Sequence, residues 1–124
     1  PDYAKVGEVL EEALIFSGHD ASPLSILESV NLPKDFLGRA VSQISGGERQ
    51  RIAVLRALVN QPKLLFADEP TGNLDQENSN KLLELFNTIK DKFETTIVVA
   101  THDKIVKNYT NRNLYLDNGI LTEN

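Results

Sequence analysis

Two adjacent carboxylates, Asp68 and Glu69, follow a short apolar run at residues 64–67 and precede Pro70. An apolar run of about four to eight residues that ends at a turn signal is typical of a buried strand in a parallel sheet. Because open α/β sheets bind ligands at the carboxyl ends of their strands, we expect the two acids at such an edge. Asp68 suits Mg²⁺, which is usually bound by one or two carboxylates together with substrate phosphates, and Glu69 would then be free to act as a general base. For this dipeptide alone, a solvated acidic loop is an equally good interpretation.

A second stretch suited to chemistry, Ser45-Gly46-Gly47, precedes a helical pattern that runs from Glu48 to Val59. The first backbone N–H groups of a helix have no partner, and the helix dipole is positive at that end. Two glycines let an anion approach the main chain and Ser45 adds a hydroxyl donor, so this stretch is suited to bind phosphate. A plain Ser-Gly cap is the commoner explanation for these residues alone. The same helix carries three arginines that form either an anion cluster or, as is usual on a helix surface, only solvated charges: Arg49, Arg51 and Arg56.

A β-branched run at residues 95–101 predicts a second buried strand, which ends at His102-Asp103. Between the strands, Asp75 is placed to cap a helix that reaches about Phe93. The buried stripe of that helix is predicted to be Leu82, Leu85, Phe86, Ile89 and Phe93. A strand–helix–strand unit forms a right-handed parallel crossover, so both strands should end at one edge. His102 beside the two acids would donate to a phosphate or position a water, although a lone histidine here is also an ordinary neighbour of a helix cap.

The remaining elements are predicted to carry no chemistry. Asp2 is placed to cap a helix over residues 3–16, and Ser22-Pro23 opens a short helix whose buried side is Leu24, Leu27 and Val30. The first 43 residues therefore form a small helical unit without a strand. Asp103 is placed to cap one further short helix through Val106, and Asn118-Gly119 between two alternating segments predicts a β-hairpin.

Composition narrows the function classes. The 124 residues are 40% hydrophobic, which suits one domain with a real core. Cysteine is absent, so no disulfide or thiolate metal site exists in this sequence, which fits a reducing compartment. The formal net charge of -5 disfavours a nucleic-acid partner. No apolar run approaches the roughly 18 residues needed to span a bilayer, and no secretory signal is visible. We therefore expect a soluble chain whose link to a membrane, if any, runs through a partner.

Four motifs in this order resemble those of the nucleotide-binding domain of ABC transporters. They are similar to its signature motif (Ile44-Ser45-Gly46-Gly47-Glu48), Walker B motif (residues 64–69), D-loop (Gly72-Asn73-Leu74-Asp75) and switch histidine (His102). The longer runs 45–51 and 67–75 look most like the branch for lipoprotein release and macrolide or peptide export. The resemblance implies an α/β fold, a partial P-loop NTPase (RecA-like) parallel sheet. It also implies a helical signature-motif subdomain at residues 1–60, and the C-terminal part of the ATPase core at 61–124, ending in a β-hairpin.

The resemblance further implies a role for each site residue. Asp68 would help hold Mg²⁺, Glu69 would polarise the attacking water, and His102 would contact the γ-phosphate of ATP. Ser45 and Gly47 would bind the γ-phosphate of ATP held by an opposite subunit, and Asp75 would pass information across that dimer interface. The whole nucleotide-binding set is Ser45, Gly46, Gly47, Glu48 and Asp75, with Glu48 standing where the signature often carries Gln. The implied partners are a second nucleotide-binding domain and a transmembrane permease that contacts the helical unit, at the cytoplasmic face of the cell membrane.

One departure from the family is severe. No stretch fits G-x-x-x-x-G-K-[ST], because none of the seven glycines precedes a lysine in that frame. In the family the P-loop, the aromatic adenine contact and the glutamine loop all lie upstream, so the chain resembles the C-terminal half of such a domain. We expect it to be inactive alone, and its apolar strand edge to pair with another copy or with the missing half. Two alternatives stay open. One is a non-enzymatic interaction module; the other is a non-transport ATPase acting on DNA or ribosomes, which the charge and the exporter-like motifs disfavour.

Overall fold

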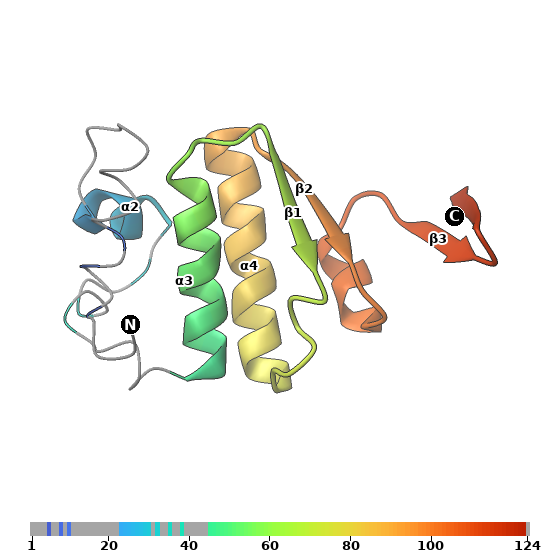
Figure 1. Ribbon diagram of the computed structural model, residues 1–124, viewed down its shortest axis with the longest axis horizontal. Helices are drawn as coiled ribbons and strands as arrows, with labels where there is room; N and C mark the ends of the chain where they lie inside the picture. Colours follow the sequence, from blue (N-terminus) through green and yellow to red (C-terminus); the bar gives the residue numbers. More distant parts are fainter. Residues whose placement is uncertain are drawn as a thin grey trace.

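The computed structural model describes residues 45–123 without a break, together with residues 23–30 and the single positions 5, 8, 10, 32, 35 and 38. In chain order its elements are the helices α2 (Pro23–Ser29) and α3 (Gly46–Leu58), the strand β1 (Leu64–Asp68), the helix α4 (Gln76–Phe93), the strand β2 (Thr96–Ala100), the 3₁₀ helix η3 (Lys104–Tyr109), and the strands β3 (Leu114–Asp117) and β4 (Ile120–Glu123). Figure 1 shows α3 and α4 side by side, with α2 on one flank and the two parallel strands on the other. The predicted helix at residues 3–16 lies almost entirely outside the described residues, as do residues 41–44.

The helix α4 begins and ends where the sequence predicts. Asp75 caps it, with its Oδ1 accepting the backbone N–H of Asn78 at 2.8 Å. Glu94 follows the last turn with a φ of 52°, a left-handed conformation that ends a helix. Lysines in the last turn complement the helix dipole. None of the helices that the structure describes is long and apolar enough to span a membrane.

The strands β1 and β2 are parallel neighbours, as predicted. Their register pairs Leu64 with Thr96 at one end and Asp68 with Ala100 at the other. Since α4 lies between them in the chain, the unit is strand–helix–strand, and both strands end at the same edge of the sheet. This edge holds Asp68, and the residues that follow Ala100 leave from it.

The helix α4 is shared by two apolar clusters. Its Leu85 and Ile89 pack with residues of α2 and α3, including Leu27 and Leu55. On the sheet side, its buried residues join one strand residue and one of η3: Leu65, Leu82, Leu83, Phe86 and Val106. The hydroxyl of Tyr109 also donates to Asn80 Oδ1 at 2.9 Å, which ties η3 to α4. The predicted buried stripe of α3 is confirmed, because Ile52, Leu55, Leu58 and Val59 are all buried.

Two predicted core residues are wrong. Leu24 is 38% exposed and Phe93 is 39% exposed. Leu24 lies in the first turn of α2, about one turn before the buried Leu27, and Phe93 lies in the last turn of α4, about one turn after the buried Ile89. Helical spacing predicts which face a residue lies on, but not how far along the helix the facing element extends.

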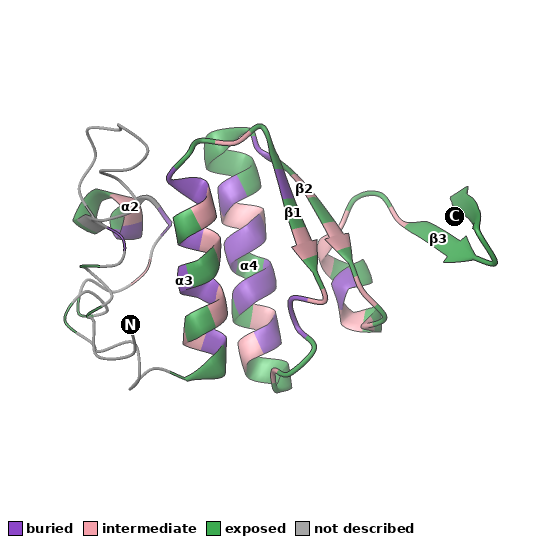
Figure 2. Cartoon of the chain, viewed as in Figure 1, coloured by how far each residue is buried: buried purple, intermediate pink, exposed green. Residues whose placement is uncertain are grey.

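The sheet is buried on one face only, which corrects the prediction that β1 and β2 are both buried strands. Leu65, Ala67, Ile97 and Val99 belong to the face that packs on α4. On the opposite face Leu64 is 54% exposed, Phe66 69% and Val98 37%, as the green stretches of both strands show in Figure 2. Strands that are apolar on both faces are typical of sheets covered on both sides, so this outer face is suited to a cover that the described residues do not supply.

The C-terminal hairpin is confirmed. β3 and β4 are antiparallel, and Asp117 pairs with Ile120 across a two-residue turn. Asn118 and Gly119 have φ values of 50° and 80°, the positive pair that the favoured tight hairpin turn requires. Every residue of both strands is exposed, and Figure 1 shows the hairpin extending away from α4 and the sheet. Hydrogen bonding and attraction to Glu123 raise the pKa of the Arg112 guanidinium.

The exposed sheet face predicts that the chain alone self-associates. Apolar sheet surface and unpaired strand edges favour pairing with another copy. We expect Phe66→Lys, which puts a charge at the centre of this face, to weaken association at least about tenfold in analytical ultracentrifugation. The matched control is Leu116→Lys, at a 74% exposed leucine of the hairpin. A chain that stays monomeric at every concentration, or equal effects of the two variants, would contradict the prediction.

Candidate functional site

The two acids leave β1 in different directions. Asp68 is the last residue of β1 and is exposed, and among the described residues no hydrogen bond or ion pair engages its carboxylate. Glu69 has a φ of 47°, and its backbone N–H donates to the carbonyl of Ala100 at 2.7 Å. A non-glycine residue in this left-handed conformation is uncommon and needs support from its surroundings. The turn sends the side chain of Glu69 toward the end of β2.

The carboxylate of Glu69 lies against the first residues after β2. Its Oε2 accepts the hydroxyl of Thr101 at 3.0 Å, and its Oε1 accepts the backbone N–H of His102 at 3.1 Å. The imidazole Nε2 of His102 lies 3.6 Å from the same Oε1, and that side chain is fully exposed. The structure therefore brings Glu69 and His102 together at the edge where Asp68 also lies. An exposed imidazole with one oxygen neighbour is free to turn toward a ligand.

The N-terminus of α3 is closed by a capping box. Ser45 Oγ accepts the N–H of Glu48 at 3.1 Å, and Glu48 Oε1 accepts the N–H of Ser45 at 3.0 Å. This exchange satisfies two backbone donors and uses the carboxylate of Glu48 within the cap. Ser45 accepts in this bond, so its hydroxyl proton is left to donate. Ser45 and Gly46 are exposed, whereas Gly47 is buried.

Gly47 is buried because Asn78 occupies the space beside it. A Cβ added to Gly47 would lie 2.5 Å from Cγ and 2.8 Å from Cβ of Asn78, closer than real atoms approach. Among the described residues, a Cβ on Gly46 would meet only Leu74, at the ordinary contact distance of 3.9 Å. Asp75 holds Asn78 in place by capping α4. The signature-like stretch therefore packs within one chain against Leu74 of the D-loop-like stretch and against the first turn of α4. This contact was not predicted, because glycine spacing does not show which side chain lies beside the glycines.

The three arginines of α3 differ in exposure. Arg49 and Arg56 are exposed, as expected, but Arg51 is only 7% exposed, so the expectation that it is a solvated charge is wrong. A long arginine stem packs readily on apolar surface, which a surface-charge argument ignores. Thr71, for which the sequence predicted no role, is 3% exposed and donates to Asp103 Oδ2 at 2.7 Å. The sequence gives one signal for this bond: Thr71 and Asp103 are polar residues that each follow the end of a predicted strand.

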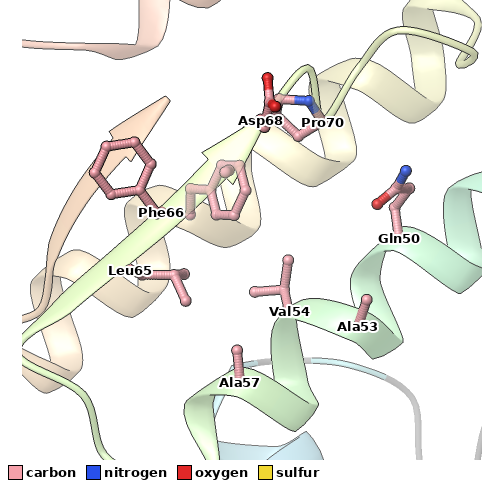
Figure 3. Close-up of a pocket in the computed structure, with 10 residues that line it drawn as sticks. Gln50, Ala53, Val54, Ala57, Leu65, Phe66, Asp68 and Pro70 are labelled. Atoms are coloured by element: carbon pink, nitrogen blue, oxygen red, sulfur yellow. The ribbon is translucent and has the colours of Figure 1, made fainter. Parts of the chain in front are cut away.

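A pocket of about 160 Å³ lies between α3 and β1. Figure 3 shows apolar side chains of both elements around it, among them Val54, Ala57 and Leu65, with Gln50 and Asp68 nearer its polar end. Ligand sites usually enclose at least about 300 Å³, so this pocket is too small for a nucleotide. The candidate chemistry lies at the sheet edge, and Asp68 is the residue of that edge that also lines this pocket.

Metal binding depends on the acids at this edge. In the part of the chain that the structure describes, no three or more His, Cys, Asp or Glu side chains gather into a ready-made cation cage. Mg²⁺ does not need one, because it keeps waters and is held by one or two carboxylates together with substrate phosphates. An exposed, unengaged carboxylate at Asp68 fits that requirement.

Comparison with known proteins decides the family. Residues 8–72, more than half of the chain, match the family model described as ABC transporter. The chain belongs to the ABC transporter family. It is 46% identical over 99 residues to the lipoprotein-releasing system ATP-binding protein LolD of Pseudoalteromonas translucida, covering 80% of this chain and 42% of LolD. It is 44% identical to the macrolide export ATP-binding/permease protein MacB of Rhodopirellula baltica, covering 98% of this chain and 17% of MacB. This ABC transporter sequence is thus an ATP-binding domain sequence of the lipoprotein-release and macrolide-export branch.

Solved structures agree on the fold. The dimeric MJ0796, a bacterial ABC transporter cassette, has a TM-score of 0.75 and 31% sequence identity, covering 99% of this chain and 58% of that one. A second structure of MJ0796 is a dimer bound to ADP and Pi, with a TM-score of 0.74 and 30% identity. The chain therefore has an α/β ABC ATPase fold with a parallel sheet and an antiparallel hairpin. It spans less than half of LolD and just over half of MJ0796.

The contact between Gly47 and Asn78 predicts a position-specific cost. Gly47→Ala should destabilise the chain by about 1–3 kcal/mol, because the new methyl group overlaps Asn78. Gly46→Ala is the matched control; it gains helix propensity without a clash and should be neutral or stabilising by up to about 1 kcal/mol. Urea unfolding followed by circular dichroism measures both. Equal midpoints for the two variants would show that the close packing is absent.

Proposed function

We propose that this chain is part of the ATP-binding subunit of an ABC transporter and couples ATP binding and hydrolysis to transport across a membrane. The observation that carries the proposal is the contact of the Glu69 carboxylate with His102 beside the unengaged Asp68 at one sheet edge. Family membership supports nucleotide binding in general. The residue roles are supported by this geometry and by the match of the motifs.

At the sheet edge, each side chain has a separate task in the proposed mechanism. Asp68 would hold Mg²⁺ together with the phosphates, and the ion would neutralise charge on the phosphate oxygens. Glu69 would take the proton of the attacking water, because within the described part of the chain each of its oxygens accepts one hydrogen bond and keeps a further lone pair for that water. His102 would donate from its exposed imidazole to the γ-phosphate.

A second copy would complete the site. The N–H groups at the positive end of α3, with the hydroxyl of Ser45, would bind the γ-phosphate held by that copy. Ser45 and Gly46 are exposed as this requires. Glu48 would act by closing the cap. Gly47, which the resemblance assigns to the γ-phosphate, is buried and would instead act by letting α4 approach. Asp75, at the adjoining cap of α4, would relay the state of the interface. MJ0796 is dimeric, which supports the presence of a second copy.

The larger assembly is proposed on the family relationship. Residues 1–60 would form the helical subdomain that contacts a transmembrane permease, and residues 61–124 would belong to the ATPase core. The protein would lie at the cytoplasmic face of the membrane. Because no P-loop motif occurs in the 124 residues, the phosphate cradle has to come from another segment. Phosphoryl transfer depends mostly on positioning and charge stabilisation, so the isolated chain should hydrolyse ATP negligibly.

The test joins this chain to the P-loop-bearing segment of the LolD relative. We expect Mg²⁺-dependent ATP hydrolysis by the joined protein, and a loss of at least about 100-fold in Glu69→Gln, because a positioned general base contributes about that much or more. ATP binding by calorimetry should persist in Glu69→Gln. The matched control is Glu84→Gln, at an exposed glutamate of α4, which should keep the wild-type rate.

Two results would contradict the proposal. The first is turnover by the isolated chain that disappears in Glu69→Gln, since it would show that no added cradle is needed. The second is a joined protein that binds ATP without hydrolysing it, which would favour the non-enzymatic interaction module.

A further inference from the structure

A chain of hydrogen bonds runs behind the Glu69 carboxylate, through residues to which the proposed mechanism gives no task. The hydroxyl of Thr71 donates to Asp103 Oδ2 at 2.7 Å, the backbone N–H of Asp103 donates to Thr101 Oγ1 at 2.9 Å, and the hydroxyl of Thr101 donates to Glu69 Oε2 at 3.0 Å. This series of hydrogen bonds thus begins in the turn after β1, crosses to the loop after β2, and returns to Glu69, the acid that follows β1.

The direction of each proton in this chain follows from the donors and acceptors present. An ionised carboxylate only accepts, so Thr71 has to donate to Asp103. A backbone N–H only donates, so Thr101 accepts from Asp103 and its own proton is directed to Glu69. The other oxygen of Asp103, Oδ1, accepts the N–H of Ile105 at 3.1 Å, which fixes the start of η3. No alternative orientation of the two hydroxyls preserves all of these bonds.

The end of this hydrogen-bond series that lies farthest from Glu69 is buried and therefore rigid. Thr71 is 3% exposed, so water competes little for its bond to Asp103. Thr101 is half-buried, whereas the Glu69 side chain is 40% exposed and would otherwise be free to adopt several rotamers. The acid is thus held from the protein side and open on the solvent side.

We propose that Thr101 is a positioning residue that holds the Glu69 carboxylate against the loop after β2, and that Thr71 braces it through Asp103. The positioning of the Glu69 carboxylate by Thr101 does not depend on any function. The effect of that positioning on ATP hydrolysis rests on the function proposed above. With Thr101 donating to Oε2 and His102 N–H donating to Oε1, both oxygens are held, and the carboxylate presents its remaining lone pairs in one direction. Catalytic groups held in this way lose large factors in rate when they are displaced by about 1 Å.

The first test measures amide hydrogen exchange by NMR on the 124-residue chain. In Thr101→Val the hydroxyl is lost while the β-branched shape is kept, so Glu69 should swing away and the His102 N–H should exchange about tenfold faster. Thr101→Ser should restore the wild-type rate. Thr71→Val should give a smaller increase, because it loosens only the brace.

The same strand offers a matched control at its other end. Thr95 is 2% exposed and its hydroxyl donates to the carbonyl of Pro62 at 3.1 Å, so Thr95→Val removes a comparable bond far from the acids. It should change His102 exchange less than about twofold. The inference is overturned if Thr101→Val leaves His102 exchange within about twofold of wild type, if Thr95→Val raises it equally, or if Thr101→Ser fails to restore it.

The second test uses the joined protein described above. Thr101→Val should lower kcat by about 10- to 100-fold with KM for ATP changed less than about threefold, because the carboxylate acts on the water and not on nucleotide affinity. Thr95→Val should leave kcat within about twofold. An unchanged kcat in Thr101→Val, or a fall matched by a parallel rise in KM, overturns the positioning role. A wild-type joined protein without hydrolysis would refute the proposed function, and the exchange experiment would then decide the inference alone.

Discussion

The parallel pairing of β1 and β2 is the constraint on which the candidate site depends. Because Asp68 lies opposite Ala100 and the N–H of Glu69 donates to the Ala100 carbonyl, the acids and the loop that carries His102 leave the sheet at the same level. Side chains alternate between faces, so a shift of this register by one residue would turn Asp68 to the other face and separate Glu69 from Thr101. The left-handed turn at Glu69 matters for the same reason, since an extended residue there would continue the strand instead of sending its side chain across to the neighbouring one.

The helix α4 joins the sheet edge to the signature-like stretch. It connects β1 to β2, packs the inner face of the sheet, and contributes to the cluster formed with α2 and α3. Its first turn also carries Asn78, which fills the space beside Gly47, while Asp75 caps it. A displacement of this one helix would therefore move both parts of the proposed nucleotide site. This gives a physical reason for the short D-loop-like segment between β1 and α4: a longer loop would uncouple the strand end from the cap that fixes Asn78.

The sequence predicted what local rules determine. Caps at Asp75 and Asp103, the buried stripe of α3, the parallel strands and the Asn118-Gly119 turn follow from periodicity and side-chain chemistry over a few residues. What escaped prediction depends on contacts between distant segments. The exposure of Leu24 and Phe93 depends on where a facing element stops, the burial of Arg51 on what covers α3, and the role of Gly47 on Asn78, 31 residues away. The bond of Thr71 to Asp103 spans 32 residues. The motif spacing predicted which side chains lie near the edge, but not the hydrogen bonds that orient them.

The outer face of the sheet connects this packing to the proposed chemistry. Phe66 lies on that face only two residues before Asp68, and Val98 is its partner on β2, so exposed apolar surface continues up to the edge that holds the acids. Any segment or copy that covers this face would also lie next to Asp68. Covering it would exclude water and lower the local dielectric, which strengthens the attraction between a bound cation and the carboxylate. The same burial would raise the cost of leaving Asp68 charged and unpaired. Folding of the cover and binding of Mg²⁺ with phosphate at the proposed site would therefore favour each other.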